Sequence, residues 1–184
     1  MNSGPPPFLS AVMCLLPAWL HITAAPETSK IPDACALLSN PAIEKVQGAP
    51  LKAKKGSVGK SNAVITSQCF FALANSSDSI SLVLTIPNPA NSRIGPRELW
   101  EKWFHESAGP EKEPPREKET EKGAQPVPVS GLGDEAYWVQ SFVGTLYVLR
   151  GNAFFRISIG GKQNDAARLQ KARILAMDVL PRMP

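Results

Sequence analysis

The chain has 184 residues, enough for one domain, and carries a net charge of +4. Its lysines and arginines are scattered among acidic residues, a pattern that favours solubility and argues against a nucleic-acid surface. It contains no zinc-ligand spacing, nucleophile elbow or dinucleotide fingerprint, so we predict no catalytic residues, no metal and no cofactor.

The first 25 residues read as an export segment. Residues 8 to 25 are apolar and end in small residues before Pro26, which is typical of a secretory signal followed by a cleavage site. We expect residues 26 to 184 to form a single α+β domain outside the cytoplasm, secreted or periplasmic. A membrane anchor is the alternative. Cys14 would permit tethering through a lipid, but Met13 precedes it where a small residue is expected.

Two cysteines remain after the export segment. Cys35 and Cys69 form an even set, and a bond between them would close a loop of 34 residues. Two buried free thiols are the alternative. A catalytic thiol is disfavoured because His105 is the only histidine left to serve as its base.

The first half of the domain predicts two helical segments and three strands. Asp33 caps a short turn to Leu38, and Ser39 or Asn40 caps a second helix that ends at Gly48. Residues 50–55 and 63–74 read as extended, and 78–86 alternates apolar and polar residues as a half-buried strand does. The turn residues before 78 predict an antiparallel hairpin.

Residues 54–62, KKGSVGKSN, resemble part of a phosphate-binding loop. Gly59, Lys60 and Ser61 match the last positions of that motif, but Lys54 stands where its first glycine should be. A strand follows instead of a helix. We therefore interpret this stretch as a basic, solvated turn between two strands.

A helix beginning at Pro96 carries an aromatic stripe. Leu99, Trp100, Trp103 and Phe104 recur at spacings of three and four, so we expect this face to pack on the sheet. Stacking on a ligand is the alternative. Residues 109–126 are then charged and rich in proline, which predicts a mobile loop within one domain.

The second half predicts three strands and a helix. Gly131 and Gly133 form a turn before a strand at 135–140, and two apolar runs flanking Gly151 and Asn152 predict a hairpin. Asn164 caps the last helix, whose buried stripe comprises Leu169, Ala172, Ala176, Val179 and Leu180. The predicted fold is therefore a twisted antiparallel sheet with helices packed on one face, in the order α-β-β-β-α-loop-β-β-β-α.

Asp134 and Glu135 are adjacent carboxylates beside two aromatic residues. Neighbours on a strand point to opposite faces, so a catalytic pair is disfavoured. A calcium site through Asp134 stays open, although no repeat of acidic ligands accompanies it.

Three stretches together resemble a family of small exported bacterial proteins and lipoproteins with a domain of unknown function: ACALLSNPAIEKVQG, SQCFF, and SGLGDEAYWV followed by LYVLRGNAFFRISIGG. The resemblance spans most of residues 33 to 180. It implies a compact α+β domain, a bond between Cys35 and Cys69, and a place outside the cytoplasm. It implies no activity.

The prediction for function is a non-catalytic exported domain that binds a partner protein or a cell-envelope component through the uncovered face of its sheet. Tyr137, Val139, Tyr147 and Phe154 are the candidate residues, and packing beneath helices or loops is the alternative for them. The second hypothesis is a carrier of an apolar small molecule, held between the sheet and the helix of Trp100 and Trp103. The third is a hydrolase that uses His105.

Overall fold

The protein is described by a computed structural model that covers residues 1–2, 4, 31–90, 94–106 and 125–184. Residues 31–184 form one compact unit. The expected export segment, apart from its first few residues, and nearly all of the expected charged loop lie outside the described residues. In the parts of the chain that are described, no helix is long and apolar enough to cross a membrane.

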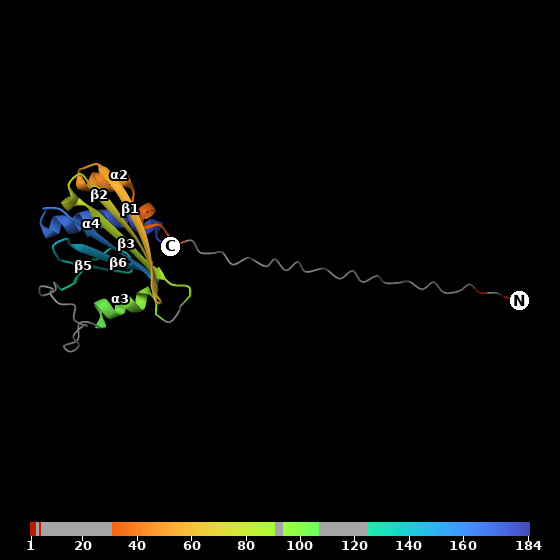
Figure 1. Cartoon of the computed structure of the whole chain (residues 1–184). Coiled ribbons are helices and arrows are strands. Elements are labelled where there is room, and N and C mark those ends of the chain that lie inside the picture. Colours follow the sequence, from red (N-terminus) through yellow and green to blue (C-terminus); the bar gives the residue numbers. More distant parts are fainter. Residues whose placement is uncertain (3, 5–30, 91–93, 107–124) are drawn as a thin grey trace. The chain divides into compact units, whose positions relative to one another are not determined.

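The domain is built on one antiparallel sheet of seven strands in the order β1-β2-β3-β7-β6-β5-β4 (Figure 1). The α+β class is therefore confirmed. The strands are β1 (Leu51–Lys60), β2 (Val64–Leu73), β3 (Ile80–Pro87), β4 (Val127–Pro128), β5 (Glu135–Val139), β6 (Thr145–Arg150) and β7 (Ala153–Ile159). The helices are α1 (Ala34–Leu37), α2 (Asn40–Gln47), α3 (Pro96–Phe104) and α4 (Asp165–Val179), with short 3₁₀ turns at Ser76–Asp78 and Leu180–Arg182.

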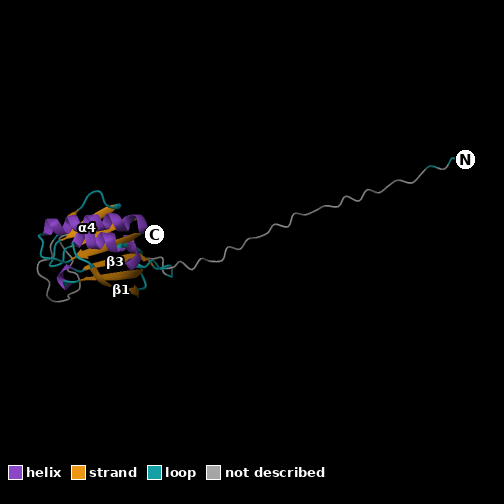
Figure 2. Ribbon diagram, turned by 90° about the horizontal axis from the view of Figure 1, so that it is seen from above, coloured by secondary structure: helices purple, strands orange, loops and turns teal. Residues whose placement is uncertain are grey.

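Three helices cover one face of this sheet, and α3 lies on the other. Figure 1 shows α2 and α4 on one side and α3 on the opposite side, and Figure 2 shows α4 lying over the strands. The expectation that all helices share one face is wrong for α3. The reason is the alternation of β7, in which Phe155 faces α4 while Phe154 points the other way and packs against Trp100 of α3.

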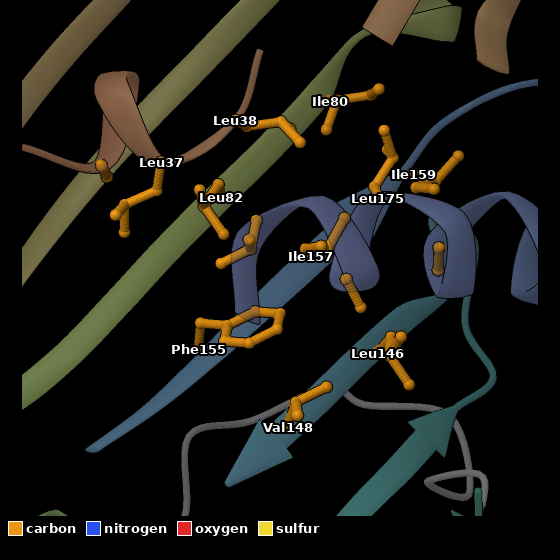
Figure 3. Close-up of a cluster of buried hydrophobic side chains, with 14 of the residues drawn as sticks. Leu37, Leu38, Ile80, Leu82, Leu146, Val148, Phe155, Ile157, Ile159 and Leu175 are labelled. Carbon is orange, nitrogen blue, oxygen red and sulfur yellow. The ribbon is translucent and has the colours of Figure 1, made fainter. Parts of the chain in front are cut away.

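The main core lies between α4, α1, α2 and the sheet (Figure 3). Alternate residues of the strands supply it, as their period of two requires. Leu82 of β3, Ile157 of β7 and Leu146 of β6 are fully buried there, and Leu175 of α4 packs above them. Asn164 caps α4 by accepting a hydrogen bond from the Ala167 amide at 2.9 Å, as the sequence predicts.

The prediction of a turn at 54–62 is wrong, because most of these residues belong to strand β1. Residues 51–60 form one continuous strand, and the chain reverses only after Lys60. Lysine and glycine are poor strand formers, but the apolar strand β2 supplies a ladder of hydrogen bonds along the whole length of β1. As the edge of the sheet, β1 needs no apolar face, and its lysines deter pairing with another chain. The strand that follows Ser61 is confirmed.

The two halves of the domain share an order of elements but not a rotational symmetry. A two-fold axis normal to the sheet between β3 and β7 would exchange β1-β2-β3 with β5-β6-β7. Such an axis keeps each face of the sheet in place. It would therefore put α3 and α4 on the same face, whereas they pack on opposite faces.

A disulfide joins Cys35 of α1 to Cys69 of β2. Helix α1 has only four residues, too few to be stable alone, and it depends on contacts from outside its own turn. Asp33 caps it by accepting from the Cys35 amide at 2.9 Å, and the Ser67 hydroxyl accepts from the Ala34 amide at 3.0 Å. The bond fastens this turn to the sheet.

The carboxylate of Asp178 ties the end of α4 to the start of α2. It accepts from the Ser39 amide at 2.9 Å and pairs with Arg182 at 2.8 Å. Partial burial alone would raise the pKa of Asp178, but the hydrogen bonds from Arg182 and Ser39 hold it below its ordinary value of 3.8. In the folded protein this carboxylate is therefore favoured in its charged form.

Replacing Asp178 with asparagine should lower the free energy of unfolding by about 1 to 2 kcal/mol at pH 7. Folding lowers the pKa of Asp178, so its charged carboxylate stabilises the protein at pH values above the pKa of the unfolded chain. This stabilisation is lost as the pH falls through the pKa that Asp178 has in the folded protein. Urea unfolding at pH 7 and near pH 3 measures this. The difference between variant and wild type should shrink at the lower pH, and an equal difference at both values would contradict the assignment. Glu106→Gln, at an exposed carboxylate, is the control.

Candidate binding site on the second face of the sheet

The face opposite α1, α2 and α4, here called the second face, is covered by α3 only in part. Strand register places its side chains in rows that cross the sheet. One row is Lys55, Phe70, Ser81, Ser158, Thr145 and Val139. The next is Ser57, Gln68, Val83, Arg156, Tyr147 and Tyr137. Neither row contains an acidic residue.

A pocket of about 620 Å³ opens over the first of these rows. Its hydroxyl groups come from Ser76, Ser77, Ser79, Ser81 and Ser158, and we call it the serine pocket. Phe70, Phe142 and Val143 supply apolar groups, and Gly160, Gly161 and Lys162 complete the lining. The volume lies in the range of sites that hold small molecules or single groups of a polymer.

The wall of the serine pocket is held by backbone contacts. The Gly160 amide donates to the Ser79 carbonyl at 3.2 Å, which packs the turn at 76–79 against the end of β7. A Cβ at Gly160 would lie 2.0 Å from the Ser77 carbonyl oxygen, so only glycine allows this approach. The Ser158 and Thr145 hydroxyls are 3.0 Å apart and bond each other. The pocket is thus preformed by elements that are distant in sequence.

The rim of the pocket is apolar and exposed. Phe142, in the loop between β5 and β6, is 97% exposed, and Phe70 of β2 is 43% exposed. Exposed phenylalanines beside a pocket whose surface is mostly apolar, with serine hydroxyls among its lining, are unusual on a surface with no partner. They offer a flat apolar surface next to hydrogen-bonding groups.

Three cations lie on the same face of the sheet as the serine pocket, and one of them lines it. Lys162 lines the pocket, and Lys55 and Arg156 lie on the second face in the rows described above. All three are exposed. Within the described residues none of them takes part in an ion pair. The two rows therefore carry positive charge, while the carboxylate of Asp78 lies in the turn at 76–79, next to the Ser77 hydroxyl at 3.4 Å.

The sequence-predicted candidates lie on the same second face, mostly under α3. Phe154 is buried against Trp100 at a ring distance of 5.8 Å. Tyr137 stacks on Phe104 at 4.5 Å, and Tyr147 meets the same ring edge-on at 5.4 Å. Val139 is half-buried in the row of Ser158 and Thr145. Their binding role stays a prediction.

The two tryptophans of α3 are in different surroundings. Trp100 is fully buried, and its indole Nε1 donates to the Glu135 carboxylate at 3.1 Å. Trp103 is 47% exposed and touches Phe154 edge-on at 5.5 Å. The helix face is thus packed on the sheet, as its spacing predicts. The serine pocket is lined by other residues than these.

Glu135 is the charged centre of the α3 contact. It accepts from Trp100 and lies 2.8 Å from His105 Nε2. Burial alone would raise the pKa of Glu135, but the hydrogen bonds from Trp100 and His105, with the charges of His105 and Arg97, hold it below its usual value. Burial and the nearby carboxylates of Glu135 and Glu101 raise the pKa of Tyr137.

Asp134 has a separate, structural set of partners. It pairs with Arg97 of α3 at 3.0 Å and accepts from the Gly151 amide at 2.8 Å, while Arg97 also donates to the Gly151 carbonyl. The two adjacent carboxylates therefore serve different contacts. Asp134 fastens α3 to the hairpin of β6 and β7.

Sequence reasoning missed the serine pocket because its residues come from β2, the turn at 76–79, β3, the loop before β6, and the end of β7. Two features of the sequence could have pointed to this pocket: the polar positions Ser81 of β3 and Ser158 of β7, and the apolar pair at 142–143 in a loop. No protein-family model, curated protein or solved structure matches the chain.

Proposed function

We propose that this protein is an exported, non-catalytic domain that binds a partner protein or a cell-envelope component on the second face of its sheet. The chemistry of that face favours an acidic glycan of a bacterial cell envelope. The observation that carries the proposal is the serine pocket with its exposed phenylalanine rim and the cations on the same face.

The lining of the pocket supports a sugar ligand. Serine hydroxyls both donate and accept hydrogen bonds, as the hydroxyl groups of a sugar require. The exposed ring of Phe142 offers a flat apolar surface to the C–H face of a sugar ring. Specific sites of this kind combine an apolar surface with a few placed polar groups.

The charge of the face supports an acidic ligand. Lys55, Arg156 and Lys162 make no ion pair within the described residues, and no carboxylate belongs to the two rows beside them. A positive surface with no internal partner attracts an anion and speeds its association. The carboxylate or phosphate groups of an envelope polymer fit this surface.

The disulfide supports residence outside the cytoplasm. Bonds of this kind persist in oxidising compartments and are rare where thiols are kept reduced. Export in turn places the second face within reach of envelope polymers. Membership of the exported family that the sequence resembles is part of the same proposal.

Co-sedimentation with purified peptidoglycan sacculi tests the proposal. We expect binding of the wild type to weaken as salt is added, because the attraction is between exposed charges. The double variant Arg156→Glu and Lys162→Glu should bind at least about tenfold more weakly, a loss of about 1.4 kcal/mol. Phe142→Ser should weaken binding without affecting the fold, since its side chain is almost wholly exposed.

The matched control is Lys45→Glu, which makes one charge reversal on α2 on the other side of the sheet. This variant should bind as the wild type does. Equal binding by all variants, or binding that salt does not change, would contradict the proposal. If Phe142→Ser alone abolishes binding and the charge variants do not, the serine pocket binds an apolar ligand and the acidic-glycan proposal fails.

A further inference from the structure

Three metal-ligating side chains converge where the end of α3 meets β5. His105 Nε2 lies 2.8 Å from Glu135 Oε2 and 3.9 Å from Glu101 Oε2. One ligand atom from each of the three residues falls within 4.8 Å of the others. Donor atoms around a tetrahedral zinc ion stand roughly 3.4 Å apart, given bonds of about 2.1 Å. Only small side-chain movements separate this cluster from such a geometry.

The backbone fixes the relation between Glu101 and His105. Glu101 lies on α3 and His105 is the residue that caps its C-terminus, four positions later; the His105 amide donates to the Glu101 carbonyl at 2.8 Å. Residues four apart on a helix present their side chains to the same side. A single turn therefore supplies an imidazole and a carboxylate to one point.

Glu135 is held in place from the sheet side. It is the first residue of β5, and the buried Trp100 donates its Nε1 proton to the same oxygen that faces His105. A donor that orients a carboxylate ligand is typical of the surroundings of metal sites. The ring of Tyr137 meets the imidazole edge-on at 6.2 Å and limits its orientation.

We propose that Glu101, His105 and Glu135 form a binding site for a divalent transition-metal ion, with zinc as its best fit. The donor set is one imidazole and two carboxylates, and imidazole suits zinc and its neighbours better than it suits calcium or magnesium. Water completes the four ligands of zinc. The ion takes the Nε2 lone pair of the neutral His105 imidazole, whose one proton is then on Nδ1.

The site joins α3 to β5 and shares no residue with the serine pocket. The bound ion acts as a cross-link between helix and sheet, so the folded state gains stability that rises with the logarithm of the free ion concentration above its Kd. The inference is independent of the proposed envelope binding. Either one can fail while the other holds.

Isothermal titration of the metal-free full chain with Zn²⁺ tests the site. We expect one ion per chain and a melting temperature that rises with Zn²⁺ concentration. His105→Ala and Glu135→Gln should each weaken binding at least about tenfold, and Glu101→Gln should weaken it as well. Titration with Co²⁺ should give the visible absorption of a low-coordinate ion with a nitrogen ligand, and this signal should vanish in His105→Ala.

Two controls separate this site from surface binding. Glu106→Gln removes the carboxylate next to His105, and His21→Ala removes the other histidine of the chain. Both should bind Zn²⁺ as the wild type does. The proposal is overturned if no binding occurs at millimolar Zn²⁺, if His105→Ala binds unchanged, or if His21→Ala abolishes binding. An absence of binding would mean that Glu101, His105 and Glu135 form only a hydrogen-bonded cluster.

Discussion

Replacing Cys35 and Cys69 together with alanine should lower the free energy of unfolding by about 3 to 4 kcal/mol. The bond closes a loop of 34 residues, and without it the unfolded chain regains the freedom of that loop. The loop contains α1, α2, β1 and most of β2. Cys69 is also fully buried in the main core, so its replacement removes packing contacts.

Denaturant unfolding with and without a reducing agent measures this effect. Wild type should fall to nearly the stability of the double variant when it is reduced, while the variant should not respond to the reductant. Cys14→Ala is the control, because it removes a cysteine that takes no part in the Cys35–Cys69 bond and should leave the response to the reductant unchanged. A wild type whose midpoint ignores the reductant would show that the bond does not form.

Replacing Trp100 with alanine should cost about 3 to 5 kcal/mol. Its indole fills the space between α3 and the second face, against Phe104, Tyr137 and Phe154 at ring distances of 4.5 to 5.8 Å. Truncation leaves a cavity there and removes the donor from the Glu135 carboxylate. The variant therefore loses both packing and a hydrogen bond to a charged group.

Trp103→Ala is the matched control for this prediction. This variant also removes a tryptophan side chain from α3, but about half of the Trp103 side chain is exposed. It should lower the free energy of unfolding by about 1 kcal/mol or less. Urea unfolding of the two variants gives the comparison. Similar losses in both would contradict the packing of α3. Because Trp100 also orients Glu135, its variant should in addition bind Zn²⁺ more weakly if the proposed site exists.

The local elements of this fold could be predicted because each depends on a short pattern. The alternation of β3 and the apolar runs around Gly151 define strands whose faces the structure confirms. The caps at Asp33 and Asn164 set where α1 and α4 begin. These signals lie within a few residues of the element that they define, so no knowledge of the tertiary structure was needed.

The features that depend on tertiary contacts could not be predicted in this way. Strand β1 has a sequence typical of a turn, and only its pairing with β2 makes it a strand. The face of the sheet on which α3 packs depends on whether Phe154 or Phe155 contacts Trp100, and neighbouring residues of β7 point to opposite faces. The cluster of His105 and Glu135 joins residues 30 positions apart, and the serine pocket joins five segments.

The central claim is that the second face binds an acidic glycan at the serine pocket. Backbone amide chemical-shift mapping with a soluble peptidoglycan fragment tests it most directly. We predict shifts concentrated at Phe70, Ser81, Gly160, Gly161 and Lys162, with the amides of α2 and α4 unchanged. Shifts confined to those helices, or none at low salt and millimolar fragment, would contradict the claim.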